Sequence, residues 1–468
     1  MKTIILISIV GIASLFGGIF NVKNAILLIF ILIGLILGVI FNINDWNTSI
    51  KYFNEMIWYD NYTIVFSSAM IIASIFIFLT CFSYYKKEFQ HTSDIYGLVL
   101  FMLVGGIVMI AAFNFVMFFI GLEILSISLY ILTGSNRKNK LSNEASLKYF
   151  LTGSMASGIL LFGIALVYGA TTSFNFQQIS QKASTFTATS PLLSIGYLLI
   201  TVGFLFKISA VPFHTWTPDV YEGSPTIITM FMATVVKTAA VGSFLRFLWL
   251  AKLSEALSFS HEWEIIFSII ATATLLIGNI TALYQTNLKR LLAYSSISHI
   301  GYLLLGVGFM NNNPQFFNWI VYYLIAYSLA TIAVFTVILV IKDNKNKVSI
   351  ELEDLSGLGK TNPVLSFILS LSLFSLAGIP PLAGFMAKYY MFTIALEKNY
   401  LWLVIIAVIT STVGLYYYIR LINRMYREDA STSTTQLNIT RPYYIVLIIT
   451  SILLVIVGLF PQLITHLL

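Results

Sequence analysis

Residues 25–43 read AILLIFILIGLILGVIFNI, a run in which Asn42 is the only polar side chain. A helix needs roughly 20 consecutive apolar residues to cross a bilayer, so this run has the length of one span. Similar runs follow one another along the chain, separated by short polar breaks. The pattern predicts a polytopic membrane protein built from helices.

The composition supports the same class. Hydrophobic residues make up 58% of the 468 positions, charged residues make up 10%, and the mean hydropathy is +0.89. These values exclude a soluble domain. The net charge of +7 is accounted for by basic residues in connecting loops and by lysines inside the apolar runs, so it requires no nucleic-acid partner.

We expect an all-α fold with about 14 transmembrane helices. Met1 and Lys2 precede an apolar run as in a signal peptide, but no small-residue cleavage site follows, so the run is kept as the first helix. The expected helices span residues 3–20, 25–43, 60–82, 96–113, 114–133, 146–169, 191–210, 225–250, 263–284, 290–310, 317–341, 364–396, 400–423 and 442–465.

Basic residues in the loops predict the orientation, because Lys and Arg are retained on the cytoplasmic side. Even-numbered loops carry only Lys51, Lys182, Lys252 and Lys398. Loops after odd-numbered helices carry Lys23, Lys86, Lys87, Arg137, Lys138, Lys140, Lys289, Arg290, Lys342, Lys345, Lys347, Lys360, Arg424, Arg427 and Arg441. Both termini are therefore expected on the non-cytoplasmic side.

Four ionisable residues lie inside long apolar runs: Glu123, Lys207, Lys237 and Lys388. Charged side chains at membrane depth are costly and usually mark an ion or proton pathway. The alternative is a structural role, with Glu123 as a helix–helix hydrogen bonder and the lysines as buried structural cations. We interpret the four residues as a transport site.

Two of the expected helices contain breaks. Pro212 interrupts the seventh run five residues after Lys207, and the sequence GIPPLAG at 378–384 interrupts the twelfth run just before Lys388. Proline removes a backbone hydrogen bond, and the freed carbonyls are tolerated at membrane depth only against protein or a wet cavity. Each break therefore predicts a cavity beside a lysine.

The spacing of these residues suggests an internal repeat. Glu123 precedes Lys207 by 84 residues, and His299 precedes Lys388 by 89 residues, with five helices between equivalent positions. An odd number of spans per unit predicts two repeats of inverted topology. We expect a three-helix segment over 1–95, the first repeat (helices 4–8) over 96–250, the second (helices 9–13) over 251–426, and helix 14 over 427–468.

Several further residues have two open interpretations. Lys148 follows Glu144 by one helical turn, which suits either a surface ion pair or a gate for proton uptake. His299 lies in a serine-rich helix, where it either satisfies neighbouring hydroxyls or relays protons. His214 is equally open.

Other charged residues are expected to be structural. Asp219 and Glu222 follow the seventh-helix break and are expected to bind the loop against cytoplasmic basic residues. Arg246 and Arg420 are expected to snorkel near helix ends.

The sequence contains no recognisable motif for redox chemistry, which we therefore expect outside this chain. Cys81 is the only cysteine, which excludes disulfides and cysteine-ligated clusters within the chain. The histidines show no ligand spacing, and no Gly-rich nucleotide motif is present; the histidines are His91, His214, His261, His299 and His466. We expect no cofactor or metal in this chain.

Four motifs resemble one family. They are KYFLTGS at 148–154, KISAVPFHTWTPDVYEGSP at 207–225, NLKRLLAYSSISH at 287–299 and AGIPPLAGFMAK at 377–388. The chain resembles the antiporter-like membrane subunits of proton-pumping NADH-quinone oxidoreductase, respiratory complex I, a group that includes subunits L, M and N and Mrp-type cation/proton antiporters. The resemblance covers essentially the whole length.

Within that group the resemblance is closest to subunit N, at TPDVYEG over 217–223. Lys388, where subunit M has glutamate, argues against M, and the lack of a long C-terminal lateral helix argues against L. One departure is Ile227, where the family pattern has a second proline after Pro225. This leaves the start of the eighth helix less constrained.

The resemblance implies a relay along the membrane midplane. Glu123 would pair with Lys207, and protons would pass through Lys237 towards Lys388. A carboxylate about 4 Å from a lysine contributes roughly 4 kcal/mol in favour of the charged form at an effective dielectric near 20, so a movement of Glu123 would decide whether Lys207 keeps its proton.

The resemblance also implies the setting. NADH, FMN, iron–sulfur clusters and quinone would bind in partner subunits, and electron transfer from NADH to quinone there would drive proton movement here. The expected neighbours are subunits M and K in a bacterial inner membrane. Two alternatives remain: an Mrp-type sodium/proton antiporter subunit, and a non-pumping structural subunit.

Overall fold

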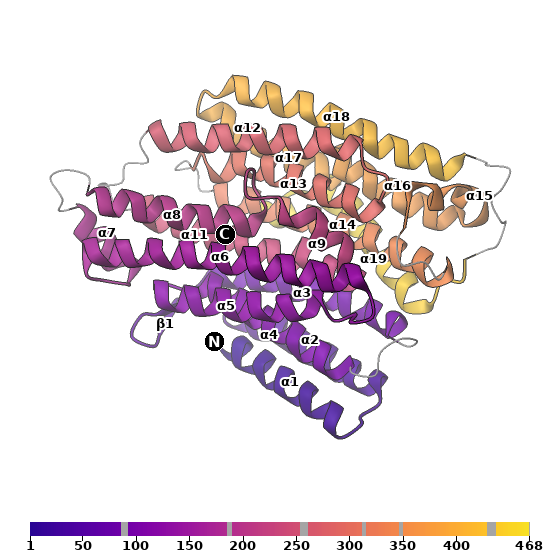
Figure 1. Cartoon of the computed structure of the whole chain (residues 1–468), viewed down its shortest axis with the longest axis horizontal. Coiled ribbons are helices and arrows are strands. Elements are labelled where there is room, and N and C mark those ends of the chain that lie inside the picture. The colour runs from indigo at the N-terminus through magenta and orange to yellow at the C-terminus, as the bar shows by residue number, and fades with distance from the viewer. Residues whose placement is uncertain are drawn as a thin grey trace. The chain divides into compact units, whose positions relative to one another are not determined.

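The computed structural model describes residues 1–85, 92–184, 190–252, 261–310, 315–345, 350–427 and 437–467 (Figure 1). Lys86, Lys87, His91 and Lys347, which entered the sequence predictions, lie outside these residues. The described chain forms two compact units. Unit 1 comprises Met1–Ser74, His91–Trp216 and Val235–Phe267, and unit 2 comprises Ile75–Gln90, Thr217–Thr234 and Ser268–Leu468.

Helices dominate unit 1, and most of their bounds agree with the predicted spans to within a few residues. The exceptions are α6, which begins earlier, α7, which was not predicted, and α11, which forms only the second part of the predicted span over 225–250. Helices α3 and α12 continue into unit 2. The elements are α1 (Lys2–Ile19), α2 (Asn24–Asn44), β1 (Ile50–Tyr52), β2 (Ile57–Tyr59), α3 (Asn61–Tyr84), α4 (Thr92–Ala111), α5 (Phe115–Thr133), α6 (Lys140–Thr171), α7 (Phe176–Ser184), α8 (Pro191–Ile208), α11 (Lys237–Lys252) and α12 (His261–Leu283).

Unit 2 holds the other elements, including the two halves of the predicted twelfth helix. They are α9 (Trp216–Gly223), α10 (Thr226–Phe231), the π-helix η1 (Met232–Val236), α13 (Leu288–Val307), α14 (Phe316–Lys345), the 3₁₀ helix η3 (Leu352–Leu355), α15 (Leu358–Thr361), α16 (Pro363–Ala377), α17 (Ala383–Glu397), α18 (Leu401–Tyr426), α19 (Arg441–Leu459) and α20 (Gln462–Thr465). The first residue of α9 and the last two of η1 belong to unit 1.

Twelve helices in the described residues are long and apolar enough to cross a membrane. The two predicted spans outside this set have specific features. Helix α13 carries Lys289, Arg290 and a polar stretch around His299, and the span over 364–396 is divided into α16 and α17. The predicted all-α membrane fold and both breaks are confirmed.

Close helix packing in unit 1 depends on small residues. Gly105 of α4 faces α5, where a Cβ atom would lie 2.6 Å from the backbone nitrogen of Leu125. Gly121 of α5 is equally close to the backbone of Met109. Small residues let helix backbones approach closely in a bilayer. The pair positions α5, which carries Glu123.

Unit 1 contains a hairpin and a short helix that were not predicted from the sequence. Strands β1 and β2 form an antiparallel hairpin in which Ile50 pairs with Tyr59. Its turn places Phe53, Asn54 and Glu55 at positive φ, and the segment lacks the Asn-Gly or Asp-Gly signal of a tight hairpin. Helix α7 is short and amphipathic. An all-α description therefore omits one small sheet.

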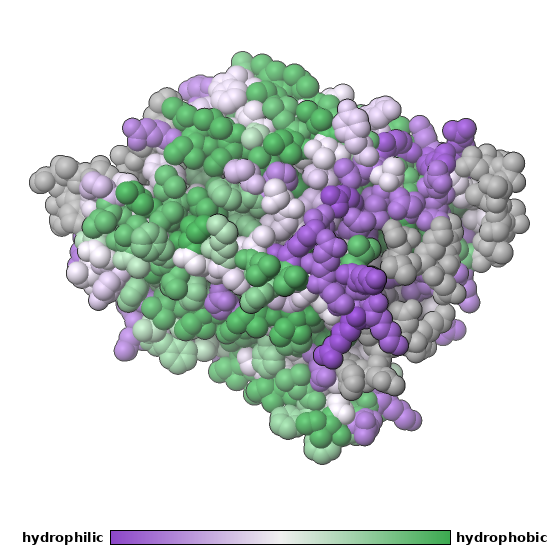
Figure 2. Space-filling view, viewed as in Figure 1, coloured by the Kyte–Doolittle hydropathy of each residue, from purple (hydrophilic) through white to green (hydrophobic). Residues whose placement is uncertain are grey.

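The outer surfaces of α6 and α8 are strongly apolar. Phe150, Leu151, Met155 and Phe162 of α6 are exposed, as is Leu198 of α8. Figure 2 shows hydrophobic side chains, in green, covering wide areas of the surface over these helices. A soluble protein rarely exposes such patches, whereas in a bilayer they face a matching environment.

Candidate functional site

The first candidate site lies where the seventh predicted span is broken. Helix α8 ends at Ile208, and Ser209 follows in the left-handed conformation, with φ 67°. The indole nitrogen of Trp216, at the start of α9, donates a hydrogen bond of 3.2 Å to the Phe206 carbonyl oxygen. Lys207 therefore lies in the last turn of a helix, where unpaired carbonyls favour a cation.

Lys207 is enclosed by side chains of α5 and α6. It is 7% exposed, and its Nζ donates to Ser126 Oγ at 2.6 Å. The ammonium lies 5.7 Å from the centre of the Tyr149 ring, which stacks on Trp216 at 4.5 Å. Ring faces attract cations, so the pocket holds the charge with a hydroxyl and an aromatic face.

Glu123 lies one turn before Ser126 on α5. Its Oε1 is buried and has no hydrogen-bond partner among the described residues. The carboxylate attracts the Lys207 ammonium electrostatically, but the lysine bonds Ser126 rather than the carboxylate. The sequence therefore identified both charged groups, whereas the serine that takes the hydrogen bond was missed.

Lys237 begins α11 directly after the π-helix Met232–Val236 and is 3% exposed. π-Helical turns are rare and are often found at functional sites. The sequence analysis did not predict this turn. The only signal available was a run of β-branched residues, Thr234, Val235 and Val236, whose stiff side chains disfavour regular helix.

The second candidate site lies at the break between α16 and α17. Lys388 is 6% exposed, and its Nζ donates to the Ala377 carbonyl oxygen at 2.8 Å and to Ser411 Oγ at 2.9 Å. The ring of Tyr302 lies 4.7 Å from Nζ. Because Ala377 ends α16, its carbonyl has no intrahelical partner, and the lysine supplies one.

A glycine permits the two half-helices of this break to meet. A Cβ atom on Gly384 would lie 1.7 Å from the Ser375 carbonyl oxygen. The backbone nitrogen of Gly384 also donates to Ser375 Oγ at 3.1 Å. Any larger residue would push α17 away from α16. The position of Lys388 therefore depends on Gly384.

His299 of α13 is held between tyrosine hydroxyls. Its Nδ1 lies 2.7 Å from Tyr323 Oη, and its Nε2 lies 3.4 Å from Tyr418 Oη. A cavity of about 10 Å³, a size that accommodates roughly one water molecule, adjoins the ring. Its lining consists of His299, Tyr323, Ala326, Tyr327, Ser375, Leu376, Gly384 and Ala387.

Lys148 and His214 lie apart from these hydrogen bonds. Lys148 Nζ forms an ion pair of 2.6 Å with Glu144, and both side chains are exposed, at 44% and 56%. The surface-pair interpretation is thus confirmed, and the uptake role stays a prediction. His214 is half-buried in the loop between α8 and α9, and its buried Nδ1 has no hydrogen-bond partner among the described residues.

Acidic residues of α9 bind the start of α13. Arg290 Nη1 lies 2.6 Å from Asp219 Oδ1 and 3.0 Å from Glu222 Oε2, as expected for a structural role of the acids. Lys289 donates to the carbonyl oxygens of Glu222 and Ser224 at 2.8 and 2.5 Å. Lys289 was predicted to lie in a loop, but it belongs to α13, is 6% exposed, and binds carbonyls at and just after the end of α9.

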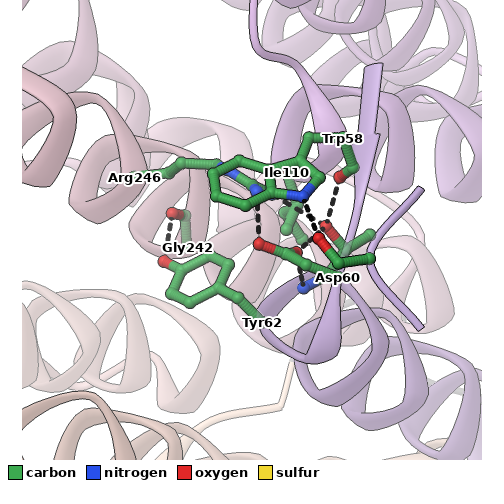
Figure 3. Close-up of polar contacts among 8 residues, drawn as sticks. Trp58, Asp60, Tyr62, Ile110, Gly242 and Arg246 are labelled. Carbon is green, nitrogen blue, oxygen red and sulfur yellow. Dashed lines mark hydrogen bonds and ion pairs between the residues drawn. The ribbon is translucent and has the colours of Figure 1, made fainter. Parts of the chain in front are cut away.

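The expectation that Arg246 snorkels is wrong. Its side chain is 2% exposed and makes an ion pair of 2.7 Å with Asp60 (Figure 3). It also donates to Thr63 Oγ1 at 2.7 Å and to the Ile110 carbonyl oxygen at 2.8 Å. The ring of Trp58 lies 5.1 Å from the guanidinium carbon. The sequence could not show that the β2–α3 junction brings a carboxylate to this helix.

Arg420 also bonds protein rather than reaching towards a membrane surface. It donates to the carbonyl oxygens of Leu283 and Gln285 at 2.7 and 3.0 Å, at the end of α12. Among the described residues no group of three His, Cys, Asp or Glu side chains is arranged to hold a metal ion. Cys81 is a buried free thiol. The charged groups in the spans are therefore the candidates for function.

Taken together, the broken helices and buried lysines define a polytopic membrane protein with the fold of an antiporter-like subunit. A family profile described as NADH:quinone oxidoreductase/Mrp antiporter, transmembrane, matches residues 112–414. NADH-quinone oxidoreductase subunit N of Cytophaga hutchinsonii is 42% identical over 99% of this chain and 98% of its own length. The chain therefore belongs to the NADH-quinone oxidoreductase subunit N family.

Solved structures agree. A chain of respiratory complex I from Thermus thermophilus is 30% identical, with a TM-score of 0.82 over 99% of this chain and 98% of its own. A chain of the Mrp complex from a Dietzia species has the same TM-score over 100% of this chain and 94% of its own, at 21% identity. The second likeness concerns the fold alone.

Proposed function

We propose that protons move through this chain by way of Glu123, Lys207, Lys237, His299 and Lys388. The family supplies the setting: the chain is a proton-translocating membrane-arm subunit of NADH-quinone oxidoreductase, and it functions with other subunits of bacterial respiratory complex I. The observation that carries the proposal is the matched surroundings of the two buried lysines.

Each lysine donates a hydrogen bond to a serine hydroxyl that can rotate. Lys207 donates to Ser126 and faces the Tyr149 ring, while Lys388 donates to Ser411 and faces the Tyr302 ring. A serine hydroxyl both donates and accepts, so it can pass a proton to or from the amine by rotating. A purely structural cation would need only acceptors.

Glu123 would control the first lysine. Its buried Oε1 lacks a hydrogen bond among the described residues, so the carboxylate is not fixed at that atom. We infer that quinone reduction in partner subunits shifts the carboxylate relative to Lys207 and so changes the cost of keeping the ammonium charged. Lys207 would then discharge through Lys237.

His299 would serve the second lysine. The cavity beside its ring adjoins Ala387, the residue before Lys388, and has the volume of about one water. Neutral imidazole accepts a proton on one nitrogen and donates from the other, so a histidine can relay without net change. Lys388 would finally release its proton outward.

The finer setting is also part of the proposal. Lys148 and His214 would assist proton uptake, subunits M and K would be the neighbours, and both termini would face the non-cytoplasmic side of the inner membrane. The two lysine sites would belong to inverted repeats over 96–250 and 251–426. NADH, FMN, iron–sulfur clusters and quinone would remain in partner subunits.

The test uses the whole complex in sealed membrane vesicles, with protons translocated per NADH as the measurement. Lys207→Ala should abolish or sharply reduce this ratio, because the site loses its titratable group. Lys140→Ala provides a matched control, since Lys140 is an exposed residue at the start of α6. An unchanged ratio in Lys207→Ala would reject the proposal.

Two other functions make different predictions in the same vesicles. A sodium/proton antiporter would require sodium for proton movement, whereas the proposed pump requires NADH and quinone. The 42% identity with a subunit N favours the pump. A structural subunit would leave proton movement intact when Lys207 and Lys388 are both neutralised.

A further inference from the structure

We propose that Ser295 and Tyr418 form, together with His299 and Tyr323, a hydrogen-bonded proton relay within unit 2. The inference rests on the proposed function and adds residues that supply His299 with protons. It concerns three helices: α13 contributes Ser295 and His299, α14 contributes Tyr323, and α18 contributes Tyr418.

The geometry forms a chain of four side chains. Ser295 Oγ lies 2.5 Å from Tyr418 Oη, which lies 3.4 Å from His299 Nε2. On the other side of the ring, Nδ1 lies 2.7 Å from Tyr323 Oη. Both ring nitrogens therefore have a hydroxyl partner, an arrangement that a histidine serving only as an acceptor would not need.

Each group in this chain can donate and accept a proton. A proton that arrives at Ser295 Oγ displaces the serine proton to Tyr418 Oη, and the tyrosine proton moves to His299 Nε2. The imidazole releases its Nδ1 proton to Tyr323 Oη, and the tyrosine releases its own proton to a water in the cavity that Tyr323 lines. One proton moves, no electron is transferred, and no bond between heavy atoms changes.

The hydroxyl groups of the proposed relay belong to buried side chains, and this burial indicates that the hydroxyls have a role. Ser295 is 2% exposed, and Tyr418 and Tyr323 are each 1% exposed. A buried hydroxyl costs free energy unless it is bonded, so phenylalanine would fill the same space at lower cost if packing were the only requirement. The hydroxyl of Tyr418 is directed to Ser295 and His299, whereas that of Tyr322, the neighbour of Tyr323, donates to the Val457 carbonyl oxygen at 3.0 Å.

The relay ends near the second lysine. Tyr323 and His299 both line the cavity of about 10 Å³, as do Gly384 and Ala387 at the start of α17. A site of this size accommodates roughly one water molecule. Lys388 follows Ala387 directly in the chain. The four side chains thus extend from Ser295 of α13 towards the break between α16 and α17, after which Lys388 follows.

The experiment compares two phenylalanine variants of buried tyrosines in the intact complex. Tyr418→Phe removes the hydroxyl that joins Ser295 to His299, and Tyr322→Phe removes a buried hydroxyl that donates to the Val457 carbonyl oxygen instead. Protons translocated per NADH should fall roughly tenfold in the first variant, because a positioned proton-transfer group contributes at least that much, and should change less than about twofold in the second.

Two further measurements separate a relay from packing. Ser295→Ala shortens the relay with a smaller change of shape and should reduce the ratio in the same direction. The solvent deuterium isotope effect on residual translocation should increase in Tyr418→Phe, because proton transfer becomes limiting. Equal losses of assembled complex in both tyrosine variants, with an unchanged isotope effect, would overturn the relay.

Failure of this inference is distinguishable from failure of the proposed function. If Tyr418→Phe translocates protons normally while Lys388→Ala does not, Tyr418 is not a relay residue and the lysine pathway stands. If Lys388→Ala also translocates normally, the proposed pathway through unit 2 is wrong as a whole.

Discussion

The Lys207 and Lys388 sites contain the same kinds of side chains, but their electrostatic surroundings differ. Both lysines lie at a helix break, donate to a serine and face a tyrosine ring. Lys207 has the carboxylate of Glu123 nearby, whereas Lys388 bonds the terminal carbonyl of α16 at Ala377. In the predicted repeats, His299 takes the position of Glu123. Under the proposed function, Glu123 would control the charge of Lys207 in unit 1, whereas His299 would pass protons towards Lys388 in unit 2.

In the predicted repeats, matching positions carry residues that make different contacts. Three residues after Glu123, Ser126 supplies the hydrogen bond to its lysine; three residues after His299, Tyr302 supplies the aromatic face. The serine of the second site comes from α18 instead. Equivalent sequence positions therefore do not guarantee equivalent chemistry, and substitutions should affect the two sites unequally.

The largest expected effect concerns the backbone of the two breaks. Gly384→Ala should prevent accumulation of the assembled complex, because the new methyl group would lie 1.7 Å from the Ser375 carbonyl oxygen. Ser209→Gly should be tolerated and even stabilise the first break by about 1 kcal/mol, since Ser209 has a φ of 67° that glycine adopts freely. Native gels and thermal denaturation would report both. Normal assembly of Gly384→Ala would show that the second break is not held by close contact.

The next effect compares an arginine from each unit. Arg246→Ala should lower stability by about 3–5 kcal/mol, because it leaves Asp60 without its largely buried partner. Arg290 and Asp219 are each 32% exposed and Glu222 is 26% exposed, so solvent screening should limit the loss in Arg290→Ala to about 1 kcal/mol. Thermal denaturation of the purified complex measures the difference. Equal losses would contradict the contrast in burial.

A third prediction compares the proposed electrostatic role of Glu123 with the proposed proton-relay role of His299. Glu123→Gln should reduce protons translocated per NADH roughly tenfold, which corresponds to about 1.4 kcal/mol of lost electrostatic control. His299→Gln retains hydrogen bonding but cannot relay a proton, so it should reduce translocation with a larger solvent isotope effect. If both variants show the same isotope effect, the two units do not differ as proposed.

The smallest expected effect concerns the serines. Ser126→Ala and Ser411→Ala each remove one hydrogen bond to an ammonium but keep the titratable lysine, so each should slow translocation less than about tenfold. Lys388 keeps its bond to Ala377, so Ser411→Ala should slow translocation less than Ser126→Ala does. Initial rates of proton uptake in vesicles would rank the two variants. The reverse ranking would show that Ser411 is the more important partner.

The sequence predicted the charged groups but not their polar partners. Glu123, Lys207 and Lys388 are visible because a charge in an apolar run is rare, and the breaks are visible because proline and glycine have fixed backbone effects. Ser126, Ser411 and Tyr418 are ordinary residues whose roles depend on which helices meet. Contacts between distant segments cannot be read from local periodicity.

Arg246 illustrates the same limit of prediction from sequence, because its partner is distant in the chain. Its position near a helix end is typical of snorkelling, and only the hairpin, with its turn residues at positive φ, places Asp60 within bonding distance. The π-helix before Lys237 was missed for a related reason. One additional residue in a helical turn leaves almost no trace in the amino-acid pattern.

That additional residue has a consequence for the rotation of the span. Each residue of an α-helix turns the chain by about 100°, so the π-helix Met232–Val236 sets the angular phase of every side chain that follows it. If the same five residues formed a regular α-helix instead, every later residue would be rotated by the turn of one residue, about 100°, and Arg246 would point away from Asp60. The phase of α11 is thus specified by five residues at its start.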